Sequence, residues 1–427
     1  MIGMVTQGRF AERVAAHRGL TVQARMGFSQ PEMMRVGLRA VRDSGVDTVG
    51  TITLDSFTRT GDLRRAREAL MRGTSLNGFP LVAYGGRRTR DLLAEFDQQT
   101  FPVQLRHGSA LPSRIFTQML AAGITATEGG PVSYCLPYGR TPLRDAVADW
   151  SRACELLGAY DGDDGPVHLE TFGGCMLGQL CPPGLLVALA ILEAMFFIEH
   201  GVRSVSLSYA QQSCWGQDVG AVWALRRLAR ERLGDAAWHI VIYTWMGVYP
   251  RSRSGAMALL GESARLAAAT GSERLIVKTA SEAVRIPTIA ENVAALRHAT
   301  AAAETVSPAQ VDTADGHDIY EEACTLVDAV LEQHRRLGPA LIGAFRRGLL
   351  DVPYCLHPDN AQRARAVIDD TGRLHWASTG AMPIRPAGGT GRTPVTADRL
   401  LFMLQHKQRR NDHNSDALNH QSKGFTR

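Results

Sequence analysis

Short runs of β-branched residues alternate with longer helical patterns along the chain as far as about residue 300. Such alternation is typical of parallel βα units, because a helix carries the chain back from the end of one strand to the start of the next. The strand candidates are Thr21–Arg25, Thr48–Leu54, Pro80–Tyr84, Pro102–Arg106, Ile124–Glu128, Val167–Phe172, Ser204–Ser208, His239–Thr244 and Leu275–Thr279. The helical patterns between them include Leu63–Met71, Thr141–Leu157, Pro183–Glu199 and Val219–Leu233. A closed barrel of such units needs eight strands, so at least one of the nine candidates is expected to lie outside the sheet.

The length of the chain allows one large α/β barrel with appendages or two ordinary domains, since 45% of its 427 residues are hydrophobic. The alternation favours an N-terminal arm over residues 1–20 and a catalytic (β/α)8 TIM-type barrel over residues 21–300. Beyond the barrel, Ile319–Leu337 and Gly338–Leu350 are helical patterns without strands, which predicts a C-terminal helical appendage over residues 301–395. Residues 396–427 end in a polar stretch with few large apolar side chains, and we expect a partly disordered tail there.

Composition argues against several classes of function. The net charge of +5 is spread along the chain without a run of five or more like charges, which argues against nucleic-acid binding. Leu185–Ile198 is shorter than the roughly 18 to 20 residues of a membrane span and contains Glu193, so we predict a buried helix and no membrane insertion. Seven cysteines without a CxxC pair argue against a disulfide framework and a zinc site. Since Met1–Leu20 also lacks an apolar signal segment, a reducing cytoplasm is the expected location.

Three arginines fall at or just beyond the C-terminal ends of early strand candidates: Arg25 in TVQARMG, Arg59 in TITLDSFTR and Arg106 in PVQLRHG. In a parallel barrel these ends meet at one mouth, where substrates bind. Any one of these arginines alone is more simply explained as a surface residue in an ion pair. Together they would repel one another without an anion, and a guanidinium binds a carboxylate through two parallel hydrogen bonds. The three positions therefore predict a site for a dicarboxylate.

Two further groups of residues follow strand candidates. The segment TEGGPVSYCLPYGR carries Glu128, Tyr134 and Tyr138, and its paired glycines allow a sharp turn close to a ligand. Glu128 beside three arginines is suited to accept a substrate ammonium, although spacing alone favours a simple turn with two packing tyrosines. Lys278 and Glu282 are four residues apart after the last strand candidate. If a helix directly follows the strand, Lys278 and Glu282 lie close together on one helix face and could hold the two hydroxyls of a ribose. An ordinary salt bridge between them is the alternative.

In their order along the chain, these motifs resemble those of the large (E, or epsilon) subunit of glutamate mutase, also called methylaspartate mutase. The similar segments are QARMG (23–27), TITLDSFTR (51–59), SLNGFP (75–80), VQLRHG (103–108), EGGPVSYCLPY (128–138), FGGCMLGQLCPP (172–183), QDVGA (217–221), TWMGVYP (244–250), IVKTASEAVRIPT (276–288) and GLLDVPY (348–354). They cover roughly residues 20–360. Several long segments in a conserved order are far more specific than any one motif.

The resemblance implies a (β/α)8 barrel subunit that interconverts L-glutamate and (2S,3S)-3-methylaspartate by a radical rearrangement dependent on adenosylcobalamin. The substrate-binding residues that it implies are Arg25, Arg59, Arg106, Glu128, Tyr134 and Tyr138. Those implied for catalysis are Glu128, Arg106 and Tyr134. Those implied for the cofactor are Lys278, Glu282, Arg274, Asn77 and Gly27, and no metal site of the chain's own is expected. In the family the arginines bind the carboxylates, the glutamate meets the amino group, and the lysine–glutamate pair holds the adenosyl ribose.

The cobalamin is expected to come from a separate small subunit, which in this family carries a DxHxxG motif. Here Asp315, Gly316 and His317 open such a pattern, but Tyr320 occupies the place of the glycine. A heterotetramer of two large and two small subunits is the expected assembly.

The sequence also departs from the family pattern. Arg274 stands where a lysine is expected near the adenosyl site, Arg285 where a glycine is expected, and Ile289 where a lysine is expected. The alternatives are a mutase of the same scaffold that acts on a related amino acid, a cobalamin-independent barrel lyase or aldolase with Lys278 as its Schiff-base candidate, and a non-catalytic amino-acid-binding paralogue.

Overall fold

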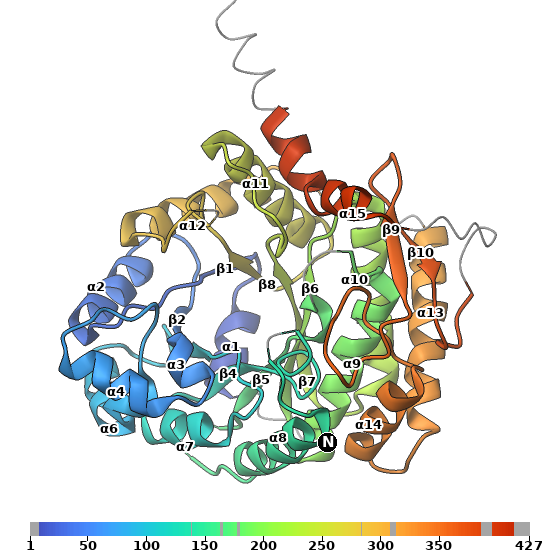
Figure 1. Cartoon of the computed structure of the whole chain (residues 1–427). Helices are drawn as coiled ribbons and strands as arrows, with labels where there is room; N and C mark the ends of the chain where they lie inside the picture. The colour runs from blue at the N-terminus through green and yellow to red at the C-terminus, as the bar shows by residue number, and fades with distance from the viewer. Residues whose placement is uncertain are drawn as a thin grey trace, which may run out of the picture.

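Eight parallel strands form a closed sheet in the computed structural model, which describes residues 8–137, 139–162, 165–176, 180–282, 284–307, 313–385 and 395–413. The strands are β1 (Thr21–Ala24), β2 (Gly50–Thr53), β3 (Val103–Arg106), β4 (Ala126–Gly129), β5 (His168–Thr171), β6 (Ser204–Ala210), β7 (Ala237–Tyr243) and β8 (Arg274–Val277). Neighbours pair in the order β1-β8-β7-β6-β5-β4-β3-β2. The ring closes where Val22 of β1 pairs in parallel with Thr48, just before β2 (Figure 1). The predicted (β/α)8 barrel is confirmed.

Helices surround the ring and connect each strand to the next (Figure 1). After β1, β3, β4, β6, β7 and β8 come α2 (Pro31–Arg42), α7 (Ser113–Ala121), α8 (Leu143–Gly158), α10 (Trp215–Arg232), α11 (Arg253–Ala269) and α12 (Ile289–Ala303). After β2 come α3 (Ser56–Arg59), α4 (Leu63–Met71), α5 (Leu81–Tyr84) and α6 (Gly86–Leu93), and after β5 come the 3₁₀ turn η1 (Gly173–Cys175) and α9 (Pro183–Glu199). Before β1, α1 (Arg9–Ala16) packs at the N-terminal ends of the strands, where Phe10 stacks on His168 with ring centroids 5.2 Å apart.

One of the nine strand predictions, Pro80–Tyr84, is wrong. This segment forms the short helix α5, and only the preceding Phe79 meets the sheet, in an isolated bridge with Leu54. β2 pairs directly with β3 along its whole length, so no strand can lie between them. Proline has no N–H to donate to a neighbouring strand, which disfavours a central strand that begins at Pro80.

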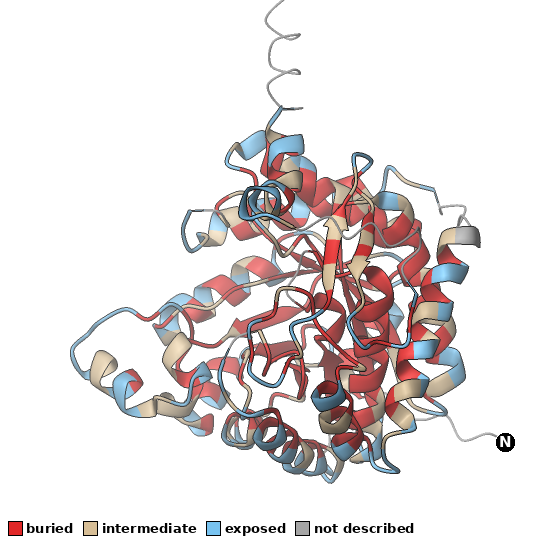
Figure 2. Cartoon of the chain, turned by 45° about the vertical axis from the view of Figure 1, so that its right-hand side comes forward, coloured by how far each residue is buried: buried red, intermediate tan, exposed pale blue. Residues whose placement is uncertain are grey.

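The apolar helix α9 is buried along most of its length. Every residue from Pro183 to Ala194 is buried, including Glu193, and Figure 2 shows this interior in red. Helix α13 (Thr313–Leu331) packs on α9 from outside the barrel, so α9 lies between the barrel and a further layer. The prediction of a buried helix is confirmed. In the part of the chain that the structure describes, no helix is long and apolar enough to cross a membrane.

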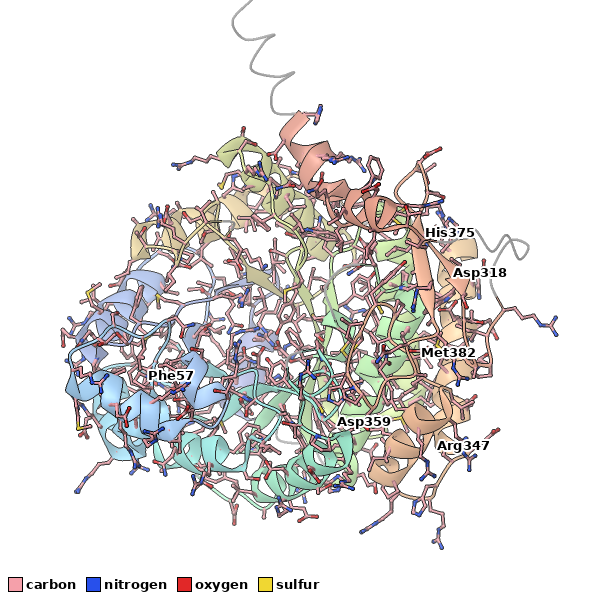
Figure 3. The ribbon with its side chains drawn as sticks, in the orientation of Figure 1. Phe57, Asp318, Arg347, Asp359, His375 and Met382 are labelled. Carbon is pink, nitrogen blue, oxygen red and sulfur yellow. The ribbon has the colours of Figure 1, made fainter. Side chains whose placement is uncertain are left out.

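The C-terminal appendage contains a β-hairpin as well as helices. Its elements are α13, α14 (Leu337–Arg347), β9 (Arg365–Ile368) and β10 (Leu374–Ser378), and α15 (Ala397–Leu404) follows in the predicted tail. The prediction that no strand follows residue 300 is therefore wrong, because β9 and β10 are short antiparallel strands. The hairpin is joined to α13 by Trp376, whose Nε1 donates to Glu322 at 3.0 Å. Figure 3 labels His375 of the hairpin and Asp318 of α13 on this flank of the molecule.

Part of the predicted tail is folded. Residues 397–404 and 406–413 are helical, and the second of these segments packs on the barrel. Lys407 Nζ pairs with Glu262 at 2.7 Å, and Gln408 Nε2 donates to the carbonyl of Tyr249 at 3.0 Å. The expected partly disordered tail thus begins with helical residues, and residues 414–427 lie outside the described part.

The inside of the barrel contains a buried ion pair. Arg274, the first residue of β8, pairs through Nη2 with Glu170 of β5, and both side chains are fully buried. Gln104 Nε2 also donates to Glu170, at 3.1 Å, and Arg106 Nη1 lies 3.8 Å from its other oxygen. Burial would raise the pKa of Glu170, but the guanidiniums of Arg274 and Arg106 outweigh this and hold the pKa below its ordinary value. Glu170 is therefore ionised.

Glu170→Gln is expected to lower the free energy of unfolding by about 3–5 kcal/mol, because it leaves the buried guanidinium of Arg274 without its counter-charge. Urea unfolding followed by circular dichroism measures the change. Glu68→Gln is the matched control, since Glu68 pairs with Arg64 at 2.9 Å on the exposed side of α4. That variant should change the free energy by no more than about 0.5 kcal/mol. Equal losses in the two variants would show that the buried pair does not support the barrel.

Candidate active site

Three of the predicted arginines meet at the C-terminal end of the barrel. Arg25 follows β1 directly, Arg106 is the last residue of β3, and Arg59 ends the short helix α3 that follows β2. All three line one pocket with a volume of about 110 Å³. Glu128 and Tyr134 line the same pocket. Local chain direction explains this, because every strand of a parallel barrel points its C-terminal end toward the same face.

Arg59 is held at the mouth by the N-terminal cap of α3. The Asp55 carboxylate accepts the N–H groups of Phe57 and Thr58 at 2.9 and 3.0 Å, and Figure 3 shows where Phe57 lies on this helix. The Arg59 side chain passes over Gly108, where a Cβ would lie only 2.8 Å from Arg59 Cδ. The Arg59 side chain is exposed and makes no hydrogen bond or ion pair with any residue that the structure describes. Its guanidinium is thus available to a ligand.

Glu128 is buried at the base of the pocket and has partners on both oxygens. Arg106 Nη2 lies 2.7 Å from Glu128 Oε2, which also accepts the Tyr243 hydroxyl at 2.8 Å. The Tyr134 hydroxyl donates to Glu128 Oε1. Burial raises the pKa of Glu128, Arg106 opposes the rise, and the nearby carboxylate of Glu170 adds to it. Glu128 is therefore more basic than an exposed glutamate, which suits a group that takes up a proton from a ligand.

Two residues of this network were not predicted from the sequence. Tyr243 is the last residue of β7, and its hydroxyl touches Arg106, Glu128 and Glu170. Its position at a strand end is the same signal that identified Arg106. His107 lies beside Tyr134 with ring centroids 5.2 Å apart, and it follows a predicted residue directly.

The buried ring of His107 is neutral, and its tautomer is determined by its neighbours. Its Nδ1 accepts the N–H of Ser109 at 3.0 Å, so the proton lies on Nε2, which donates to the carbonyl of Glu128 at 2.7 Å. Burial lowers the pKa of His107 to about 3. The imidazole thereby connects the ends of β3 and β4 without adding a charge to the pocket.

Lys278 and Glu282 are paired, although no helix follows β8 directly. Lys278 Nζ lies 3.1 Å from Glu282 Oε1 across a turn, and it also lies over the Tyr249 ring at 5.4 Å from the centroid. Arg25 Nη1 lies 3.1 Å from the same oxygen of Glu282. Burial lowers the pKa of Lys278 to about 8. Burial would raise the pKa of Glu282, but Lys278 and Arg25 outweigh it and lower the pKa. The pair is therefore joined to the arginine pocket through Glu282.

The remaining predicted positions lie in different places. A Cβ at Gly27 would lie 2.2 Å from the carbonyl oxygen of Thr53, so the backbone at this position is packed closely against β2. Asn77 Oδ1 accepts the N–H of Ser56 at 2.9 Å and thereby supports the start of α3. Arg274 is not brought to the mouth, because it begins β8 and its side chain is fully buried inside the barrel. The predicted Tyr138 lies outside the described residues.

Among the described residues, no group of three or more His, Cys, Asp or Glu side chains is arranged to hold a metal ion. All seven cysteines lie in the described ranges, and each is free. Burial raises the pKa of Cys175 and of Cys181, which makes these two thiols poor nucleophiles. The polar chemistry of the mouth therefore comes from arginine, lysine, glutamate and tyrosine side chains.

Comparisons with known proteins match this chain over most of its length. A model of the family described as "Methylaspartate mutase E chain (MutE)" matches residues 6–389, which is a wider range than the resemblance noted over residues 20–360. The "Glutamate mutase epsilon subunit" of Escherichia coli O157:H7 is 32% identical over 383 residues, which cover 84% of this chain and 78% of that protein. The protein of the same description from Halobacterium salinarum is 31% identical over 390 residues, covering 88% of this chain and 81% of its own. The chain belongs to the methylaspartate mutase E chain family.

Proposed function

We propose that this chain is the substrate-binding catalytic subunit of an adenosylcobalamin-dependent glutamate mutase, which interconverts L-glutamate and (2S,3S)-3-methylaspartate. The observation that carries the proposal is the pocket in which Arg25, Arg59 and Arg106 converge beside Glu128. Membership of the family supports it, and both relatives compared above are described as epsilon subunits of glutamate mutase.

The three arginines differ in how many of their hydrogen bonds and ion pairs the protein itself provides. Arg106 is fully buried and paired with Glu128, so its orientation is set before a ligand binds. Arg25 is paired with Glu282, yet its Nε is buried and has no partner among the described residues. Arg59 is exposed and without a partner among the described residues. On this proposal the two carboxylates of the substrate complete the hydrogen bonding of these groups, most of all at Arg59.

Glu128 and its hydroxyl partners are proposed to hold the substrate amino group. The carboxylate has a raised pKa, because it is buried and because Glu170 lies nearby. It is therefore suited to accept a hydrogen bond from an ammonium and to take part of its proton. The Tyr134 hydroxyl keeps Glu128 Oε1 oriented, and the Tyr243 hydroxyl does the same for Oε2.

The residues around Lys278 fit the proposed ribose of adenosylcobalamin. A buried ammonium and a carboxylate 3.1 Å apart offer both donors and an acceptor to a pair of hydroxyls. Thr53 Oγ1 in the adjacent pocket is buried without a partner in the described structure, which leaves a further donor for a ligand. When bound, adenosylcobalamin supplies the radical chemistry of the rearrangement. This chain supplies the orientation of the substrate and the exclusion of water.

A separate small subunit with a DxHxxG motif is proposed to carry the cobalamin, in a heterotetramer of two large and two small subunits in the cytoplasm. The partial motif of this chain is occupied by structural contacts. The His317 ring packs against Trp223 at 5.1 Å between centroids, and the Tyr320 hydroxyl donates to Glu231 at 2.6 Å. Val284 and Ile286, in the segment between β8 and α12, are 77% and 54% exposed and offer apolar surface to such a partner.

The purified chain is expected to form no 3-methylaspartate from L-glutamate and adenosylcobalamin until a small subunit with a DxHxxG motif is added. A coupled assay with methylaspartate ammonia-lyase, which removes ammonia from 3-methylaspartate, follows the product by its absorbance. Turnover by the chain alone would contradict the two-subunit assembly. No turnover with any competent small subunit would contradict the proposed reaction.

Arg59→Lys is expected to raise the KM for L-glutamate by roughly 10-fold to 150-fold, because a point charge cannot replace a planar fork and about 1.5–3 kcal/mol is lost with a charged hydrogen bond. No protein carboxylate is left unpaired, since Arg59 has no partner in the described part of the chain. Arg64→Lys is the control, because Arg64 is an exposed arginine of α4 outside the pocket. Equal KM values for all three proteins would exclude Arg59 from the substrate site.

The apparent KM for adenosylcobalamin is expected to rise above about pH 8, by up to about tenfold per pH unit. Burial lowers the pKa of Lys278 to about 8, so its ammonium loses the proton in this range. Lys278→Arg keeps its charge at these pH values and should abolish the rise. Lys407→Arg is the control at a second buried lysine, which is paired with Glu262, and this variant should still show the rise of KM with pH. The same pH dependence in all three proteins would contradict the role of Lys278.

A further inference from the structure

Glu193 of α9 is a buried carboxylate that the proposed chemistry does not use. It lies in the otherwise apolar part of the helix and has no exposed surface. Its Oε1 accepts the N–H of Val132 at 3.3 Å and of Ser133 at 2.9 Å. Its Oε2 accepts the Ser133 hydroxyl at 3.0 Å, the N–H of Phe172 at 3.1 Å and the N–H of Gly173 at 2.7 Å. One carboxylate therefore satisfies donors from two separate segments of the chain.

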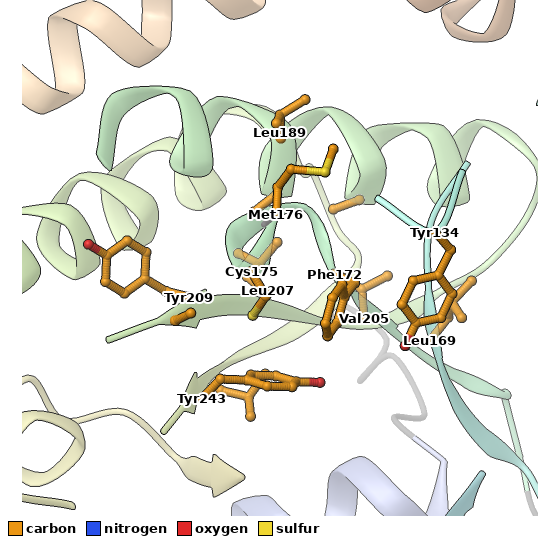
Figure 4. Packing of buried hydrophobic residues seen from close by; sticks show 14 of the residues in the cluster. Tyr134, Leu169, Phe172, Cys175, Met176, Leu189, Val205, Leu207, Tyr209 and Tyr243 are labelled. Atoms are coloured by element: carbon orange, nitrogen blue, oxygen red, sulfur yellow. The ribbon is translucent and has the colours of Figure 1, made fainter. Parts of the chain in front are cut away.

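Both of these segments form walls of the pocket. Val132 and Ser133 belong to the turn after β4, which also carries Tyr134, and Phe172 follows β5 directly. Tyr134 and Phe172 line the pocket, and their ring centroids are 4.9 Å apart. Figure 4 shows these two rings close together, with Leu189 of α9 above them. The two walls thus meet beside the same helix that carries Glu193.

The two turns pack closely against α9 around the Glu193 carboxylate. A Cβ at Gly130 would lie 1.9 Å from Glu193 Oε1, and a Cβ at Gly173 would lie 2.5 Å from the backbone of Leu189. The glycines let both turns approach α9 closely enough for their N–H groups to reach the carboxylate. A buried carboxylate that accepts several backbone N–H groups is a strong constraint on the segments that donate them.

We infer that Glu193 is a positioning residue for the proposed mutase reaction, because it fixes the turn from which Tyr134 reaches Glu128. This inference rests on the proposed function. Glu193 touches neither the pocket nor the arginines, and it acts through Tyr134, whose hydroxyl donates to Glu128 Oε1. Loss of the carboxylate frees the turn, and Glu128 then loses the hydrogen bond that orients it toward the substrate.

Glu193→Gln keeps the size of the side chain but replaces one acceptor oxygen with an NH₂ group. In either orientation of the amide, this NH₂ faces at least two of the donors that Glu193 now satisfies. The kcat/KM for L-glutamate in the reconstituted enzyme is expected to fall about 10²-fold, the scale of a misplaced catalytic group. The KM for adenosylcobalamin should stay within about twofold of the wild type.

Glu322→Gln is the matched control. Burial raises the pKa of Glu193 and of Glu322 to about 7, and both are helical glutamates, but the partner of Glu322 is Trp376 Nε1 at 3.0 Å on the outer hairpin. This variant should keep kcat/KM within about twofold of the wild type. A loss equal to that of Glu193→Gln would attribute both effects to general destabilisation and overturn the inference.

A double-mutant cycle with Tyr134→Phe separates positioning from simple destabilisation. If Glu193 acts through Tyr134, the kcat/KM of the double variant should lie within about twofold of that of the slower single variant. If the two losses multiply, the residues act independently and the inference is wrong. Should Glu193→Gln fail to fold, Ser133→Ala is the second variant, because it removes a single hydroxyl donor from Glu193. It is expected to lower kcat/KM several-fold. Combined with Tyr134→Phe, it should lower kcat/KM no further than Tyr134→Phe alone. Full activity of Ser133→Ala would also overturn the inference.

Amide hydrogen exchange tests the structural part of the inference without mutase activity. The N–H groups of Val132, Ser133, Phe172 and Gly173 should lose protection in Glu193→Gln and keep it in Glu322→Gln. Unchanged exchange at these four amides refutes the positioning role, even if the enzyme is a mutase. Absence of mutase activity in the reconstituted wild type refutes the proposed function instead, so the two failures can be told apart.

Discussion

A column of alternating buried charges runs along the inside of the barrel, and the candidate site depends on it. Arg274 pairs with Glu170 near the N-terminal end of the strands, Glu170 lies 3.8 Å from Arg106, and Arg106 lies 2.7 Å from Glu128 at the mouth. A charged side chain that is buried away from water is stable only next to an opposite charge. Each charged residue of the column therefore depends on the oppositely charged residues beside it. The orientation of Arg106 and Glu128 is thereby set before any ligand binds.

The open side of the pocket is built differently from this rigid base. Arg59 is exposed and has no partner among the described residues, while Arg25 shares Glu282 with Lys278. A binding site of this kind combines fixed groups that define the geometry with free groups that meet the ligand. The shared carboxylate of Glu282 means that the arginine pocket and the lysine pair are electrostatically connected, although they come from distant parts of the sequence.

The errors of the sequence prediction have identifiable physical causes. Pro80–Tyr84 has the composition of a strand, but β2 and β3 pair directly and leave it no place in the sheet. The resemblance implied a place near the adenosyl site for Arg274, and the structure has this residue at the start of β8, at the far end of the strand from the mouth. Tyr243 and Glu193 lie in none of the motifs, and their contacts are distant along the chain: Tyr243 meets Arg106 across 137 residues, and Glu193 meets Ser133 across 60.

The sequence by itself determined the βα alternation and the placement of Arg25, Arg106 and Lys278 at strand ends, because both depend on short-range periodicity and on chain direction. Only the tertiary structure decided that Arg25, Arg106 and Lys278 are paired with carboxylates, while the Arg59 side chain has no partner among the described residues. Arg274 and Glu170 are separated by 104 residues, and no local pattern relates them. They become partners because closure of the ring brings side chains from opposite parts of the chain into one interior without water, where every charge must find a counter-charge.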